Sequence, residues 1–328
     1  MASLKEIKTR IASVKNTLKI TSSMKLVASA KLHKAQMAIE TMMPYNERLN
    51  AMVNHLIQVA PLSTEKAPSS TCQLVNSSTE LKRVAIVTIS SNASLCGAFN
   101  NNIIRFTQGI INEYEEKLGQ GSILLIPIGR KVAQALPVNP STESSSLITD
   151  FIDLAEHPTY AQASALSSYL TDLYLRGEID RVEILYTHYK NMAVQELRRE
   201  QFLPIDKSLR STAVQECRSA DNSSGYDASM QAGQSTPSHT EEGKGWGPIL
   251  EPSLPELLAN LLPQALASSM YALLLDSQAA EHAARTFAMQ TATDNGDTLL
   301  QELNLQFNKV RQQSITNELL DIVGGQMR

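Results

Sequence analysis

The sequence of 328 residues predicts a protein of mixed α+β and α/β class. We expect a long antiparallel coiled coil of N- and C-terminal helices, together with a central Rossmann-like α/β domain. Apolar residues with a heptad spacing at each end of the chain predict the paired helices. Strands that alternate with helices between these ends predict a small parallel or mixed sheet. An ordinary helical bundle is the alternative to the coiled coil that the pattern leaves open.

Residues 1–60 are expected to form the N-terminal coiled-coil helix. The apolar positions step by three and four residues, which places them on one helix face: Leu4, Ile7, Ile11, Val14 and Leu18. Residues 1–36 hold eight Lys or Arg and one Glu, which gives this stretch +7 and leaves −11 for the rest of a chain with net charge −4. A basic rod end of this kind is expected to bind acidic surfaces.

The middle of the chain is expected to hold a loop at 61–80, rich in Ser, Thr and Pro, and an α/β domain at 81–206. Runs of β-branched and other apolar residues predict strands at 84–89, 123–128, 182–187 and 193–202. The last two strands are expected to form a hairpin through Lys190-Asn191. Helices are expected between the strands, at 97–118, 131–136 and 159–176.

Residues 207–247 are dominated by Ser, Thr, Gly, Asn and Gln, which predicts a flexible insertion. The C-terminal helices are expected at 248–328, with a short helix before a long one because Pro255 and Pro263 fit helix first turns. The long helix carries its own heptad positions, Leu300, Leu303, Phe307, Val310 and Ser314. We expect Ile11 to face this helix somewhere between Val310 and Leu319. Some 60 residues of helix would form a rod of about 90 Å.

Three cysteines (Cys72, Cys96 and Cys217) are an odd and sparse set, which favours a reducing compartment. No uninterrupted apolar run approaches the ~20 residues that span a bilayer, so we expect no transmembrane segment. Hydrophobic content of 42% supports a real core, whereas aromatic content of 5% suits long thin helices that approach closely.

Motifs for catalysis or cofactor binding are not found. Gly243-Lys244 lacks the upstream Gly and the following Ser or Thr of a phosphate-binding loop. The six His residues show no metal-ligand spacing, and His282 is expected to be a polar residue on a helix surface. Cys96 follows a strand without an identifiable His partner, so we expect a buried structural thiol. We therefore expect no catalytic site, no metal and no cofactor.

Two other classes of protein are alternatives for a chain with these patterns. One is an α/β enzyme with a coiled-coil arm, which would need a catalytic constellation or a cofactor fingerprint. The other is a coiled coil that binds nucleic acid through its basic N-terminal helix. Its lysines alternate with positions that need burial, and no aromatic residues interleave for base stacking. We therefore expect no nucleic acid among the partners.

Several segments resemble one known family. Residues 20–31 (ITSSMKLVASAK) and 95–100 (LCGAFN) are similar to its N-terminal helix and to the motif after its first central strand. Residues 281–285 (EHAAR), 292–295 (ATDN) and 307–325 (FNKVRQQSITNELLDIVGG) resemble its C-terminal signature. That family is the gamma subunit of F-type, proton-translocating ATP synthases, and the resemblance is to the bacterial type. Asn92-Ala93-Ser94 stands where the family has Asp-Arg-Gly, and Cys217 alone offers no dithiol switch of the chloroplast kind.

The resemblance implies a central rotor shaft that couples proton flow to ATP synthesis or hydrolysis and has no catalytic site. The implied partners are the alpha and beta subunits of the hexamer ring, an epsilon-type subunit and the membrane rotor c-ring. The implied location is peripheral, on the cytoplasmic face of the inner cell membrane, with the α/β domain as a foot. Carried over residue by residue, the implied partner contacts are Met24, Lys25, Arg285, Arg311, Gln312 and Thr316. Arg311 and Gln312 are expected to form a polar catch against a loop of a catalytic subunit.

Overall fold

The computed structural model describes residues 4–59, 74, 81–119, 121–136, 151–205 and 254–326. Almost all of the expected loop at 61–80 and the whole expected insertion at 207–247 lie outside these residues. Cys72 and Cys217 lie outside them as well.

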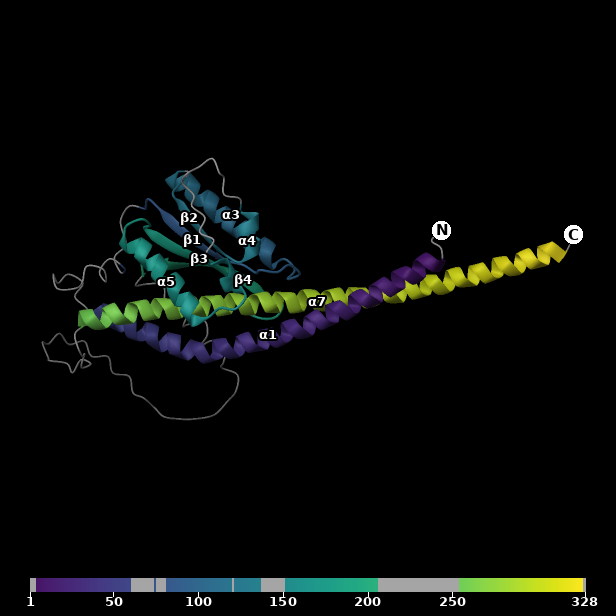
Figure 1. The fold of residues 1–328 in the computed structure, drawn as a ribbon, viewed down its shortest axis with the longest axis horizontal. Helices are drawn as coiled ribbons and strands as arrows, with labels where there is room; N and C mark the ends of the chain where they lie inside the picture. Colours follow the sequence, from purple (N-terminus) through teal and green to yellow (C-terminus); the bar gives the residue numbers. More distant parts are fainter. Residues whose placement is uncertain are drawn as a thin grey trace, which may run out of the picture.

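Two long helices run side by side through the molecule, α1 (Leu4–Val59) and α7 (Leu254–Gln326). The two chain ends lie at the same end of the rod, so the helices are antiparallel (Figure 1). With 73 residues, α7 is about 110 Å long. The apolar heptad positions at both ends are the less exposed ones, whereas most of the positions between them face solvent. The expected coiled coil is confirmed.

Contacts across the coiled coil fix its register: Lys25 Nζ donates to Gln290 Oε1 (2.8 Å), Thr293 Oγ1 donates to Thr21 Oγ1 (3.0 Å), and Gly296 lies against the Leu18 side chain. Each step toward the start of α1 matches an equal step toward the end of α7. Continued along both helices, this register sets Ile11 opposite Leu303, and Leu4 opposite Val310. The expectation that Ile11 faces a position between Val310 and Leu319 is therefore wrong. It failed because heptads repeat, so the pattern shows the face but not the register.

A short helix starting near Pro255 and a separate long helix starting near Pro263 were also expected. Instead Pro263 lies inside one continuous helix. A proline in this position removes one backbone hydrogen bond. Its neighbours Leu262 and Leu266 are each only 1% exposed, and their burial in the core holds the helix together across the proline.

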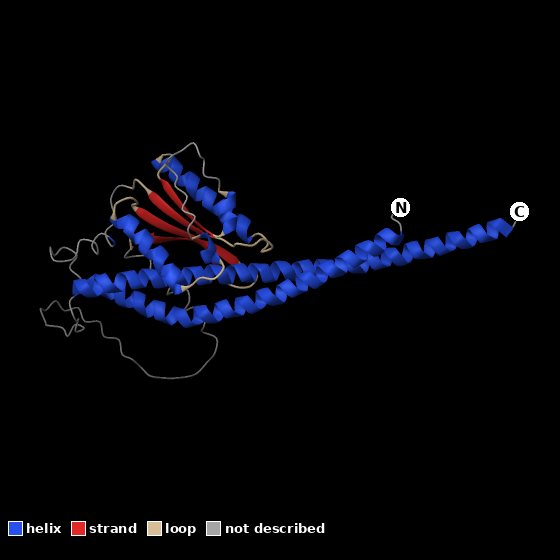
Figure 2. Cartoon of the chain, viewed as in Figure 1, coloured by secondary structure: helices blue, strands red, loops and turns tan. Residues whose placement is uncertain are grey.

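The α/β domain is built on a four-stranded sheet of order β2-β1-β3-β4 (Figure 2). Strand β1 (Val84–Ile89) pairs in parallel with β2 (Ile123–Ile128) and with β3 (Arg181–Tyr189). Strand β4 (Gln195–Leu203) pairs antiparallel with β3, which confirms the expected hairpin. The first two strands have the bounds that the sequence predicted, because each is a short and uniformly apolar run.

Each face of the sheet packs on its own helices. Helices α3 (Phe99–Leu118) and α4 (Arg130–Ala135) share a core with the face that carries Val84 and Ile86. The short 3-10 helix η1 (Ile152–Ala155), α5 (Tyr160–Leu175), α1 and α7 share a larger core with the opposite face, which carries Ala85 and Val87. The domain is thus attached to one end of the rod by an apolar layer.

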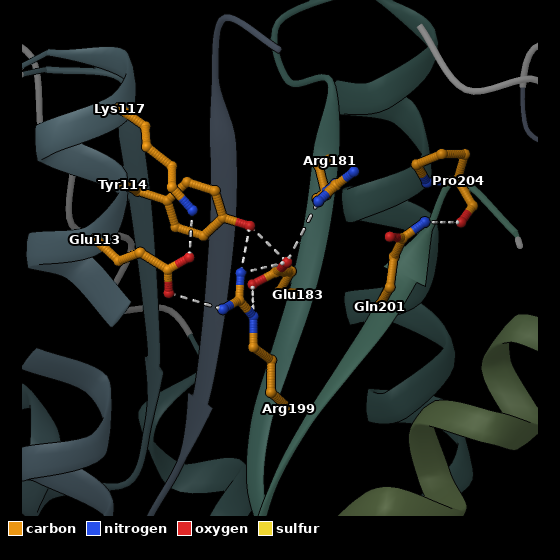
Figure 3. Close-up of polar contacts among 8 residues, drawn as sticks. All are labelled: Glu113, Tyr114, Lys117, Arg181, Glu183, Arg199, Gln201 and Pro204. Atoms are coloured by element: carbon orange, nitrogen blue, oxygen red, sulfur yellow. Dashed lines mark hydrogen bonds and ion pairs between the residues drawn. The ribbon is translucent and has the colours of Figure 1, made fainter. Parts of the chain in front are cut away.

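A polar network braces α3 against the β3–β4 hairpin (Figure 3). Glu183 lies on β3 with its side chain only 4% exposed, and Arg199 of β4 donates to both of its carboxylate oxygens, at 2.7 and 3.0 Å. Tyr114 of α3 donates its hydroxyl to the same carboxylate at 2.6 Å. The Arg199 guanidinium also pairs with Glu113 at 3.1 Å. Burial, and then the Glu183 carboxylate, raise the pKa of Tyr114.

Helix α7 contains a window of 18 residues with a mean hydropathy of 1.3, half of which is buried inside the protein. By length and composition alone such a helix could cross a membrane, and buried core helices meet the same criterion. The absence of a transmembrane segment therefore stays a prediction.

The register can be tested by crosslinking. With Cys72 and Cys217 changed to Ser, the pair Thr21→Cys and Thr293→Cys should form a disulfide readily, because the native hydroxyl oxygens are 3.0 Å apart. Loss of free thiol and a mobility shift on non-reducing gels measure the yield. The pair Ile11→Cys and Ser314→Cys, displaced by about 16 Å along the rod in this register, is the control. A higher yield from the control pair would contradict the register.

Candidate functional site

The free end of α7 extends beyond the start of α1. Because Val310 lies opposite Leu4, residues 311–326 continue as a single helix of about 24 Å within the part of the chain that the structure describes (Figure 1). Arg311, Gln312 and Thr316, all expected to contact partners, lie on this free end and are exposed. Thr316 Oγ1 donates to the carbonyl oxygen of Gln312 at 2.9 Å, so these two residues share one helix face.

Large apolar side chains are exposed on the same free end. Ile315, Leu319, Leu320 and Ile322 are between 49% and 63% exposed. An isolated helix with this much exposed apolar surface is unusual in a monomer and marks an interaction site. Sequence reasoning did not single out these residues because heptad spacing alone does not show where pairing with the N-terminal helix stops. The difference in length between the two helices was the available signal, because α7, with 73 residues, is longer than α1, with 56, and part of it must extend past α1.

Met24 and Lys25, also expected to contact partners, lie in the middle of α1. Met24 is 39% exposed and belongs to an apolar stripe with Ile20 and Val27, which are both 59% exposed. Lys25 instead turns toward α7 and is held by Gln290. The structure therefore leaves Met24 accessible and engages Lys25 within the chain.

Arg285 is held within α7. Its guanidinium pairs with Glu281 at 2.7 Å, and its side chain is only 15% exposed. Its neighbour His282 is only 6% exposed, so the expected surface location of His282 is wrong. Extending the register given above sets His282 opposite Leu32 of α1. Burial, and then the charges of Arg285 and Lys31, lower the pKa of His282 to about 4. Local sequence placed His282 beside Glu281 and one turn from Arg285, and gave no sign that α1 covers it.

The thiol of Cys96 is 2% exposed and accepts a hydrogen bond from Asn100 Nδ2 at 3.1 Å, which confirms a buried thiol. A groove of about 680 Å³ lies beside it, between the β3–β4 hairpin and α7. Its lining is mainly apolar or uncharged and includes no acidic, basic or His side chain. Among the residues that the structure describes, no three His, Cys, Asp or Glu side chains are placed to hold a metal ion.

These features define a class: an extended coiled-coil subunit whose unpaired helix end is built for contact with other proteins. The family model described as ATP synthase matches residues 3–327. ATP synthase gamma chains of Bacteroides fragilis and Bacteroides thetaiotaomicron are 48% and 47% identical, with both chains covered in full. The chain belongs to the ATP synthase gamma chain family, whose members are non-catalytic subunits of that complex.

Solved structures show the same fold at lower identity. A chain of the Euglena gracilis mitochondrial ATP synthase (OSCP/F1/c-ring) is 17% identical with a TM-score of 0.57, and covers 99% of this chain and 93% of its own. A chain of the Tetrahymena thermophila central stalk and c-ring is 22% identical with a TM-score of 0.52, covering 83% and 99%.

Proposed function

We propose that the chain is the central rotor shaft of a bacterial F-type ATP synthase, with the free end of α7 inside a ring of alternating alpha and beta subunits. The observation that carries the proposal is the free end itself. It is long, unpaired and apolar on its surface, with Arg311 and Gln312 on its exposed face. A helix of this kind needs a surrounding partner, and ATP synthase gamma chains occur in such a complex.

The shape of the molecule suits transmission of torque. Two paired helices are stiffer than one, and the α/β domain broadens the rod at the opposite end (Figure 1). We infer that this domain is the foot, which binds an epsilon-type subunit and the membrane c-ring on the cytoplasmic face of the membrane. The basic residues of α1, such as Lys8 and Lys15, are exposed and would suit acidic loops of the ring.

A shaft with no catalytic site can still control catalysis. The shaft is asymmetric because α7 extends past the first residue of α1 at the free end. At each rotational angle the shaft therefore presents a different surface to each ring subunit. A partner can shift an equilibrium only through different contacts with its two states, and asymmetry supplies that difference. Proton transfer yields about 2.3 kcal/mol per charge per 100 mV, so several protons must act through one stiff element for each ATP.

Changing Arg311 and Gln312 to Ala tests the contact. Folding should be nearly unaffected because both positions are exposed on a helix. ATP turnover or coupled proton pumping should fall, by up to about a hundredfold if one charge-assisted contact of roughly 1.5–3 kcal/mol acts in the slow step. Hydrolysis and pumping are measured in the same membranes, normalised to assembled complex. The double substitution should cost less than the sum of the single ones if both residues bind one loop.

The matched control is Arg105→Ala with Gln108→Ala, an exposed pair of the same types on α3. Normal rates and coupling in the Arg311 and Gln312 variant would reject the catch but not the shaft. The shaft itself is tested by isolating the native complex and identifying its subunits. Absence of alpha, beta and c subunits from a complex isolated through this chain would reject the proposed function.

A further inference from the structure

The edge of the foot nearest the rod carries a directional contact with α7. His188 and Tyr189 lie at the carboxyl end of β3, and Asp276 lies on α7. His188 Nδ1 is 2.6 Å from Asp276 Oδ2, and the Tyr189 backbone N–H donates to Asp276 Oδ1 at 3.0 Å. One carboxylate therefore bonds to two successive residues of the strand, and this fixes both its distance and its orientation.

Tyr189 extends the same contact to α1. The Gln36 amide of α1 donates to the Tyr189 hydroxyl at 3.0 Å. Tyr189 packs against two apolar clusters, one that includes Ala279 and Ala283 and one that includes Ala280 and Ala284. One strand end thus contacts both helices of the rod, at a position where small side chains let the backbones approach closely.

The rest of the attachment is mainly apolar, with one further hydrogen bond from Gln278 Nε2 of α7 to the carbonyl oxygen of Glu156 at 3.0 Å. Helix α5 and the sheet pack on α7 through Leu166, Leu170, Leu262 and Leu266, which are nearly inaccessible. Apolar packing resists separation but is non-directional, so it resists sliding and turning less well than hydrogen bonds do. Strand β3 is held on both sides, by β1 and by β4, so it cannot follow a movement of α7 independently.

We propose that Asp276, with His188 and Tyr189, is a torque lock that fixes the rotational position of the foot on the coiled coil. The inference rests on the proposed shaft function and deepens it. Force applied at the foot reaches α7 through Asp276 and reaches α1 through the Tyr189 hydroxyl and Gln36. These residues are positioning residues, since none of them touches a reacting group.

The test is to measure ATP hydrolysis and proton pumping by the assembled complex with Asp276→Ala, in native membranes. Hydrolysis should continue, whereas protons pumped per ATP should fall as slipped arrangements of the foot become roughly tenfold more populated through loss of a charge-assisted contact. Asp276→Asn keeps an acceptor for the Tyr189 N–H and should give an intermediate result. Glu256→Ala removes an exposed carboxylate from the same helix and should leave coupling unchanged.

A distance measurement separates a lock from a merely stabilising contact. Spin labels at Lys117→Cys on α3 and Lys34→Cys on α1, in a background with Cys72 and Cys217 changed to Ser, report the foot and the rod. The distance distribution should be narrow in the otherwise native chain and should broaden with Asp276→Ala. If Asp276→Ala prevents assembly, His188→Ala, which changes a side chain 31% exposed, takes its place with the same two readouts.

Unchanged coupling together with an unchanged distance distribution, in a complex that contains normal amounts of this chain, would overturn the lock. That outcome would leave the shaft function intact. The shaft function fails separately, if the complex assembles and pumps protons without this chain.

Discussion

Arg199→Ala is expected to destabilise the α/β domain by about 3–5 kcal/mol, the usual cost of leaving one charge of a buried pair without its partner. Glu183 would keep the Tyr114 hydroxyl at 2.6 Å and a distant Arg181 at 3.8 Å. Because Arg181 and water can reach the site in part, we expect a value near the lower limit. Urea unfolding of the full chain measures the loss, with the slope compared between variants.

Lys190→Ala on the same hairpin is the matched control. Its ion pair with Glu196 is exposed and screened by solvent, so the change should cost much less than Arg199→Ala. Changing Glu183 and Arg199 together to Leu should cost less than the sum of the single changes, since no charge is then left buried alone. Equal losses in Arg199→Ala and Lys190→Ala would show that the network contributes nothing beyond surface pairing.

The elements of the fold were predictable because each has a local cause. Ile86 and Ile126 lie in short apolar runs rich in β-branched residues, which are typical of buried strands, and Ile7 and Leu303 mark helix faces by spacing alone. The hairpin followed from the turn at Lys190-Asn191. Pro263 was misjudged because a proline is a local signal to begin a helix, whereas tertiary packing around Leu262 and Leu266 carries α7 through it.

Contacts between distant elements were not predictable from one sequence. Glu183 lies in a strand that reads as apolar, and nothing local joins it to Arg199 or to Tyr114. Asp276 likewise has ordinary helix neighbours, and its strand partners are 87 and 88 residues away. For the free end, the resemblance indicated Arg311 and Gln312, but only the register showed that they lie beyond the last paired position.

The side chains at the facing positions of the coiled coil change from apolar to partly polar along the rod. Near the free end of the rod the facing positions are apolar, as at Ile7 and Leu303. Farther toward the foot the facing positions also include Thr21, Thr293 and His282. Polar residues at such positions cost stability but can specify one register, because only this pairing brings the Thr21 and Thr293 hydroxyls together. The Thr21–Thr293 pair therefore helps to hold the register, whereas apolar positions on both sides of it, such as Ile7 and Leu32, supply burial.

His282 makes the rod sensitive to acid. Its pKa is lowered to about 4 in the folded chain, first by burial and then by Arg285 and Lys31, against about 6.5 in an unfolded chain. Between these pH values the unfolded chain binds a proton that the folded chain does not. The free energy of unfolding therefore rises with pH in this window, and the contribution is complete above pH 6.5 and lost as pH falls toward 4. From pH 7 to pH 4.5 we expect His282 to account for a loss of about 2–3 kcal/mol.

Glu281 opposes this slope, because burial raises its pKa and the folded chain then binds the extra proton. The contribution of His282 is therefore measured as a difference, by urea unfolding of the native chain and of His282→Leu at pH 7 and pH 4.5. Leu at this position would pack against Leu32 and cannot take up a proton, so the variant should lose about 2–3 kcal/mol less than the native chain. His33→Leu, on the exposed face of α1, should not change the difference between the two pH values. An equal acid loss in the native chain and in His282→Leu would mean that His282 is not held neutral in the coiled coil.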